Sequence, residues 1–212
     1  MVKGMMASAY PRQSANLHER AMAASLQLTY SQGRVPSLAQ IAEEIDVPKA
    51  SIDPVFSEGR DLLVAAIERS LTILIDNCTR AVVKVDPDDP VAQFTAIGEA
   101  YLEWASHHPA QFRLLADTRR LDYRTVPKLR RYVDSLGDLM SRLLLRAREQ
   151  GRLHPREDVE MLVLSSRSFA MGAASMLLDG RLDGRLDGAD GLGAAKRMMR
   201  DFVLRMARSS RP

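Results

Sequence analysis

The pattern of hydrophobic and polar positions along the chain predicts a succession of α-helices. Between residues 16 and 30, Leu17, Ala21, Ala24 and Leu28 recur at helical spacing and therefore share one face. No run of β-branched residues alternates with polar ones, which would be typical of a strand. The same reasoning predicts further helices over residues 37–45, from about 49, and over 59–83, 90–107, 109–115, 126–150, 156–178 and 191–208.

Turn-forming residues separate these helices. Gly33 follows the first helix as a C′ residue, the cluster Pro87-Asp88-Asp89-Pro90 breaks the chain, and Gly151 ends the helix over residues 126–150. A Leu-Asp-Gly-Arg repeat over residues 178–188 predicts a flexible loop. Its aspartates alternate with arginines, so the repeat lacks the dense oxygen ligands of a calcium loop. The predicted fold class is therefore all-α.

Composition narrows the class of protein. With 212 residues, 46% hydrophobic and 27% charged, the chain is an ordinary globular protein. No apolar stretch is judged long enough to cross a bilayer, and the N-terminus lacks the apolar core of a signal peptide, so a cytoplasmic location is expected. The single cysteine, Cys78, excludes an internal disulfide framework and a zinc site built from cysteines.

Candidate catalytic chemistry is sparse. No serine lies in a Gly-x-Ser-x-Gly context, and no glycine-rich loop for phosphate or dinucleotide binding is present. Glu99, Glu103 and His107 have a spacing that can present ligands to a metal. A solvated helix face is the favoured interpretation of these three residues. We therefore expect no enzyme activity, no cofactor and no metal.

Two short helices joined by a tight turn, preceded and followed by longer helices, form a helix-turn-helix pattern near the N-terminus. Ser37 can cap the first short helix, where free N–H groups could meet a phosphate. Ala42 is small enough for a helix crossing, and Val47 is an apolar side chain in the turn. Asp46 stands where the chain is expected to visit the left-handed region, which aspartate tolerates.

These residues resemble the tetracycline-repressor (TetR) family of bacterial regulators. The resemblance rests on Gly33-Arg-Val-Pro-Ser-Leu-Ala-Gln-Ile-Ala-Glu-Glu-Ile-Asp-Val-Pro-Lys-Ala-Ser-Ile, followed by Phe56 and Asp61-Leu62-Leu63. Further along, His108-Pro-Ala-Gln-Phe-Arg-Leu-Leu115 is similar to the short helix that opens after the hinge of the family's ligand domain. The order of helix lengths over the whole chain fits the family's nine-helix architecture.

The resemblance implies two domains with different functions. Residues 1–58 would form an N-terminal arm and a DNA-binding domain, and residues 59–212 a domain for ligand binding and dimerisation. The protein would be a homodimeric regulator of transcription, and we expect a repressor of a palindromic operator. A small apolar or amphipathic effector in the C-terminal core would lower its affinity for DNA.

Three sets of residues are the predicted sites. DNA contacts are predicted at Ser37, Lys49, Ala50 and Ser51 of the helix-turn-helix and at Arg12 and Lys3 of a basic arm. The predicted ligand pocket is formed by Tyr101, Trp104, Phe112, Met140, Phe169 and Met176. The predicted dimer interface comprises Met171, Ala174, Leu178, Met199, Phe202 and Met206.

The recognition segment departs from the family pattern. Asp53 stands where an aromatic residue is usual, and Pro54 removes a backbone donor within the expected recognition helix. Residues 37–61 contain two basic and six acidic side chains, which gives a net charge of −4. Residues 111–152 have a net charge of +6, whereas the whole chain has a net charge of +3. DNA affinity depends on basic residues at phosphates. An alternative therefore stays open: a ligand-sensing or protein-binding dimer with little DNA affinity.

Overall fold

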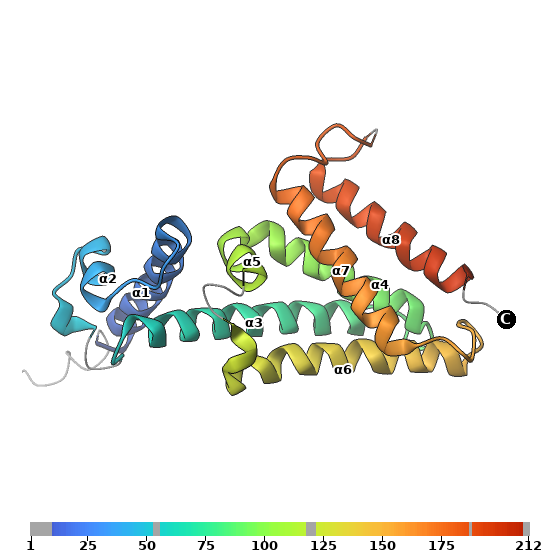
Figure 1. Cartoon of the computed structure of the whole chain (residues 1–212), viewed down its shortest axis with the longest axis horizontal. Coiled ribbons are helices and arrows are strands. Elements are labelled where there is room, and N and C mark those ends of the chain that lie inside the picture. Colours follow the sequence, from blue (N-terminus) through green and yellow to red (C-terminus); the bar gives the residue numbers. More distant parts are fainter. Residues whose placement is uncertain (1–9, 53–55, 118–121, 187, 210–212) are drawn as a thin grey trace, which may run out of the picture. The chain divides into compact units, whose positions relative to one another are not determined.

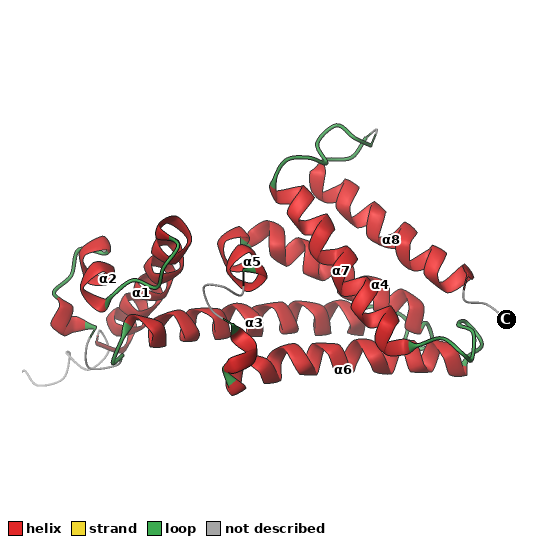
Figure 2. Ribbon diagram, in the orientation of Figure 1, coloured by secondary structure: helices red, strands yellow, loops and turns green. Residues whose placement is uncertain are grey.

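The computed structural model describes residues 10–52, 56–117, 122–186 and 188–209. These residues form eight α-helices and two short 3₁₀ helices, and none of them forms a β-strand (Figures 1 and 2). The predicted all-α class is confirmed, and the number of helices is close to the predicted nine. The chain divides into two compact units, residues 1–69 with 113–123, and residues 70–112 with 124–212. The sequence predicts a domain boundary after residue 58, whereas the first unit of the structure continues to residue 69.

Unit 1 contains the predicted helix-turn-helix. It comprises α1 (Tyr10–Gln32), α2 (Leu38–Glu44), the 3₁₀ helix η1 (Lys49–Ser51) and the first part of α3 (Gly59–Val83). A core of apolar side chains joins these elements: Ala21, Ala24, Leu28, Leu38, Ile41, Ala42, Ile45, Ile52 and Leu62. The predicted helical face of α1 is thus the face that packs. The helix itself begins at Tyr10, not near residue 16 as expected.

Two backbone positions in unit 1 require special residues. Asp46 has a φ of 52°, which places it in the left-handed region expected for the turn after α2. Gly59, the first residue of α3, lies directly against the backbone of Pro36. A Cβ atom built on Gly59 would overlap the carbonyl oxygen of Pro36. Glycine at position 59 therefore allows α3 to begin in contact with the segment that leads into α2.

Unit 2 is a helical bundle around α4 (Pro90–His107). This helix packs against α6 (Pro127–Glu149), α7 (Val159–Leu178) and α8 (Gly191–Ser209). Asp89 and Asp158 begin α4 and α7, and each carboxylate accepts a hydrogen bond from a backbone N–H three residues on, at 3.0 and 3.1 Å respectively. Two small elements complete the described chain, α5 (Pro109–Ala116) and the 3₁₀ helix η2 (Tyr123–Thr125).

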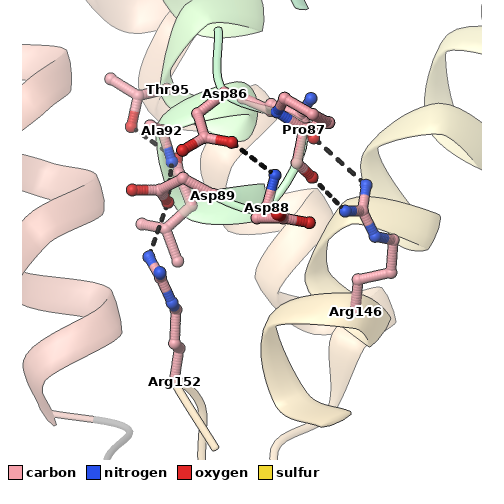
Figure 3. A network of polar contacts seen from close by, with 10 residues as sticks. Asp86, Pro87, Asp88, Asp89, Ala92, Thr95, Arg146 and Arg152 are labelled. Carbon is pink, nitrogen blue, oxygen red and sulfur yellow. Dashed lines mark hydrogen bonds and ion pairs between the residues drawn. The ribbon is translucent and has the colours of Figure 1, made fainter. Parts of the chain in front are cut away.

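The acidic turn between α3 and α4 is held by two arginines (Figure 3). Arg152 pairs with Asp89 at 2.7 Å, and Arg146 of α6 donates to the carbonyl oxygen of Pro87. The N-cap hydrogen bond from Ala92, aided by Arg152, holds the pKa of the Asp89 carboxyl below its usual value. The break that the sequence predicted over residues 87–90 is thus an ordered turn joined to the end of α6.

One expectation about membranes needs correction. Helix α7 has 20 residues and a mean hydropathy of 1.4 in its most apolar window, which by length and composition alone is enough to cross a membrane, although core helices of globular proteins also meet this criterion. Within unit 2, α7 packs against α4, α6 and α8 on one side, and 28% of the window is buried. A large part of this apolar helix is therefore uncovered in the single chain.

Candidate DNA-binding and effector-binding sites

The start of α2 is fixed by a reciprocal cap. The backbone N–H of Gln40 donates to Ser37 Oγ at 3.3 Å, and the backbone N–H of Ser37 donates to Gln40 Oε1 at 3.0 Å. The predicted DNA contact Ser37 is exposed, but its hydroxyl and N–H take part in this cap. Arg34 Nη1 lies 3.5 Å from Gln40 Oε1, which places a cationic group at the same helix end. Arg34 was not among the predicted DNA contacts, although it stands three residues before the cap.

The recognition segment is a single 3₁₀ turn in the described part of the chain. Lys49, Ala50 and Ser51 are all exposed, as a surface that meets DNA requires, and Ile52 beside them is 1% exposed. The turn is closed by hydrogen bonds from Ser51 N to Pro48 O and from Ile52 N to Lys49 O, both 2.9 Å. Pro48 begins it without a side-chain cap. Asp53 and Pro54 lie outside the described residues.

The predicted basic arm is only partly described. Arg12 belongs to α1, so it is part of a helix instead of an extended arm, and its side chain lies outside the described part of the structure. Lys3 lies outside the described residues. Arg20 of α1 donates to the carbonyl oxygen of Ile45 at the end of α2, and Glu19 pairs with Arg69 of α3 at 2.8 Å. These contacts hold α1 against both neighbouring helices of the helix-turn-helix.

Aromatic side chains of α4 and α5 form a cluster that contains half of the predicted ligand pocket. The ring of Tyr101 lies 6.0 Å from Trp104 and 6.3 Å from Phe112, measured between ring centroids. The Trp104 ring also lies 6.0 Å from that of His108, whose pKa is lowered by burial and by the neighbouring His107. Trp104 is 1% exposed, and its Nε1 has no acceptor within the described structure.

The other three residues of the predicted pocket lie in different surroundings. Met140 is buried on α6. Phe169 stacks on Phe202 of α8 with centroids 4.3 Å apart, so it pairs with a residue predicted for the dimer interface. Met176 is 38% exposed on α7. The rings of Tyr101, Trp104 and Phe112 therefore remain the candidate lining of an apolar effector site.

The residues predicted for dimerisation are divided between surface and core. Met171 is exposed, whereas Ala174 and Met199 are buried in the single chain, Met199 against Gly98 of α4. The side chains of Leu178, Phe202 and Met206 are half-buried. The structure adds two large apolar side chains that the sequence interpretation missed, Met161 and Leu164 of α7, both more than half exposed. Their helical spacing to Met171 was the signal available.

The acidic face of α4 is covered by cations of α8. Glu103 pairs with Lys196, and Glu99 pairs with Arg200, whose pKa is raised by that hydrogen bond. His107 Nδ1 lies 2.7 Å from the carbonyl oxygen of Glu103. No group of three metal-ligating side chains occurs among the residues that the structure describes. The face interpreted as merely solvated is thus an ion-paired contact between two helices.

Cys78 lies inside unit 2. Its side chain is 0% exposed, and its Sγ lies 3.8 Å from the carbonyl oxygen of Ile97. Burial raises the pKa of the Cys78 thiol to about 12. The thiolate, which is the reactive form, is therefore strongly disfavoured at neutral pH.

A family model described as the tetracyclin repressor-like C-terminal domain matches residues 94–202, slightly more than half of the chain. Comparison with curated proteins gives no match. The chain is similar in structure to the ketosteroid transcriptional regulator KstR2 of Mycobacterium tuberculosis, with 16% identity, a TM-score of 0.67 and full coverage of both chains.

Two other solved structures show the same fold. A regulatory protein of the tetR family from Rhodococcus RHA1 is 19% identical, with a TM-score of 0.69 over 90% of this chain and 96% of that chain. The fatty acid degradation regulator FadR from Bacillus halodurans is 12% identical, with a TM-score of 0.69 over 96% of this chain and 97% of that chain. At these identities the likeness concerns the fold.

Proposed function

Because the chain belongs to the TetR family of transcriptional regulators, we propose that it is a cytoplasmic repressor that binds a palindromic operator as a homodimer and leaves DNA when a small effector binds. One observation supports DNA binding above all. The capped helix α2 and the turn after it present Lys49, Ala50 and Ser51 to solvent on a packed helix-turn-helix. The regulators of this family are not enzymes, and we propose no catalytic activity.

Phosphate contacts would have to overcome the net negative charge of residues 37–61. The free N–H groups at the start of α2 attract a phosphate, and the nearby guanidinium of Arg34 adds a positive charge. Arg12 and Lys3 would supply further cations near the chain's N-terminus. Base contacts would come from Lys49, Ala50 and Ser51.

The exposed face of α7 supports the homodimer. Met161, Leu164, Met171 and Met176 are its large exposed apolar residues, and serine and glycine residues stand among them at helical spacing. An uncovered apolar face of this kind is costly in water and is typical of a protein interface. A second copy of α7 would cover it around a two-fold axis, with the exposed Met171 at the contact.

Helix α5 offers a route from the effector site to the DNA-binding unit. Phe112 belongs to the aromatic cluster in unit 2, and the next residue, Arg113, belongs to unit 1. There the Arg113 guanidinium donates to the hydroxyl of Tyr30 and lies 5.5 Å from the centroid of its ring. An effector that displaced Phe112 would therefore also move Arg113 and the end of α1. An acceptor atom on that effector could satisfy the buried Nε1 of Trp104.

A mobility-shift titration of the full-length protein with the DNA that flanks its own gene tests this function. We expect saturable binding to a palindromic site that weakens as salt increases, because phosphate contacts release counterions. Lys49→Ala should weaken binding by about tenfold, whereas Arg156→Gln, an exposed change on another unit, should not. Absence of any binding site in a genome-wide selection would refute DNA binding.

The same titration decides on a second candidate, a ligand-sensing dimer with little DNA affinity. The net charge of −4 over residues 37–61 and the single turn at Lys49–Ser51 favour this candidate. In that case no saturable, salt-sensitive shift would occur, but the protein would still be dimeric and would still bind an effector. A saturable shift with one palindromic site would reject it.

A further inference from the structure

A long groove runs along α4 in unit 2, between α3 and α8. It consists of two adjoining hollows of about 560 and 490 Å³, which share Ala96 and Glu99. Each hollow is within the size range of sites that hold small molecules. The ion pairs between α4 and α8 line the groove, and so do Trp104 and His108, whereas Tyr101 and Phe112 of the aromatic cluster do not.

The first hollow, at the beginning of α4, is mainly apolar. Most of its lining side chains are valine, alanine or leucine, with one threonine: Val85, Val91, Ala92, Thr95, Ala96, Leu204 and Ala207. Two ion pairs, Asp89–Arg152 and Glu99–Arg200, also line it. Leu204 is 49% exposed, so apolar surface faces solvent here. An aliphatic chain of a ligand would cover this surface favourably.

The second hollow carries unbalanced positive charge. Both of its carboxylates are already paired with α8, Glu103 with Lys196 and Glu99 with Arg200. Arg80 and Lys84 line the same hollow from the α3 side. Arg80 donates to the carbonyl oxygen of Asp76 and to Asn77 Oδ1, and neither cation pairs with a carboxylate within the described residues.

We propose that this groove binds an elongated amphipathic carboxylate, with its aliphatic chain in the apolar hollow and its acidic end at Arg80 and Lys84. Charge complementarity selects an anion, because the groove's acids are neutralised by their own partners while these two cations are not. The adjoining apolar hollow selects a ligand with a hydrocarbon portion. The site shares Trp104 with the predicted ligand pocket but none of that pocket's other five residues, and it does not depend on DNA binding.

The test uses decanoate as the probe and the full-length protein without DNA. Trp104 is the chain's only tryptophan and lines the groove, so its fluorescence reports on occupancy. We expect a saturable change in emission with decanoate and binding of decanol, the neutral analogue of equal chain length, that is weaker by about tenfold or more. Calorimetry under the same conditions gives the dissociation constants independently.

Two variants locate the acidic end. Arg80→Gln with Lys84→Gln should weaken decanoate binding by about tenfold while leaving decanol binding unchanged. Both side chains are exposed, so the double variant should fold, and circular dichroism verifies this. Should it fail to fold, Lys84→Gln alone replaces it, with a smaller loss expected. Arg156→Gln, an exposed arginine outside the groove, is the matched control and should bind decanoate as the parent protein does.

Three results would overturn the proposal. The first is no saturable change in emission and no heat of binding with decanoate. The second is equal affinity for decanoate and decanol, which would indicate an apolar site without charge selection. The third is unchanged decanoate binding in the variants of Arg80 and Lys84, which would place the ligand elsewhere, for example at the aromatic cluster. Failure of the protein to bind DNA would affect none of these measurements.

Discussion

Replacing Gly59 with alanine is expected to destabilise the protein, although alanine is the better helix former. In an ordinary helix interior this change stabilises by roughly 0.5–1 kcal/mol. At the start of α3, however, the new Cβ would overlap the carbonyl oxygen of Pro36, so backbone must move on one side. Inserting a carbon into a tightly packed site typically costs about 1–3 kcal/mol. The overlap involves backbone, which cannot rotate away, so the cost exceeds the gain and we expect a net loss of about 0.5–2 kcal/mol.

Gly137→Ala in α6 is the matched control. The nearest atom to its added Cβ is Arg167 Nη1 at 3.9 Å, an ordinary contact, so the usual gain of roughly 0.5–1 kcal/mol should appear. Urea unfolding followed by far-ultraviolet circular dichroism measures both variants. Fluorescence of Trp104 follows unit 2 separately, and the Gly59→Ala loss should be seen mainly in the circular dichroism transition of unit 1. If Gly59→Ala proved as stable as the parent protein, the close contact with Pro36 would be refuted.

Further predictions concern three other contacts. Asp89→Asn keeps a capping oxygen at the start of α4 but removes the negative charge, which favours the helix N-terminus and pairs with Arg152, and should cost about 0.5–1 kcal/mol at neutral pH. The pKa of Asp89 is lowered in the folded protein, so the ionised carboxylate stabilises the fold above the ordinary aspartate pKa, and this stabilisation is lost as the pH falls through the folded pKa. The variant and the parent protein should therefore have the same stability in strong acid. Denaturant titrations at several pH values measure this. Leu164→Glu should convert the proposed dimer to monomer in analytical ultracentrifugation, and an unchanged mass would exclude this face of α7. Tyr30→Phe removes the acceptor for Arg113 and should destabilise unit 1 by about 1 kcal/mol in urea unfolding, while Tyr30→Leu should cost more because it also removes the ring.

Most helix boundaries could be predicted because particular residues mark them. Pro90, Pro109 and Pro127 lie at the start of α4, α5 and α6, and Gly33 has the positive φ of 72° expected of a C′ residue. The start of α1 was missed because the residues before Leu17 lack an apolar repeat. The chain nevertheless enters the helix at Tyr10, with a proline in the first turn.

The candidate sites were less accessible to sequence reasoning because they depend on contacts between distant residues. The spacing of Glu99 and Glu103 was visible, but not their pairing with side chains about a hundred residues later. The need for glycine at position 59 could not be predicted either, because it depends on the close approach of Pro36. The aromatic cluster was foreseen in part, since Tyr101 and Trp104 share one helix and Phe112 lies on the next.

The buried thiol of Cys78 can be used to measure rare local unfolding of the helices that cover it. A thiol reagent cannot reach a fully covered sulfur, so modification in native conditions requires a fluctuation that exposes this part of α3. With one cysteine in the chain, every modified molecule records an event at a single known position. The rate of thiol labelling therefore measures how often the contact between α3 and α4 opens. A small molecule that slows this labelling must stabilise the closed state, so its binding can be detected without an attached dye.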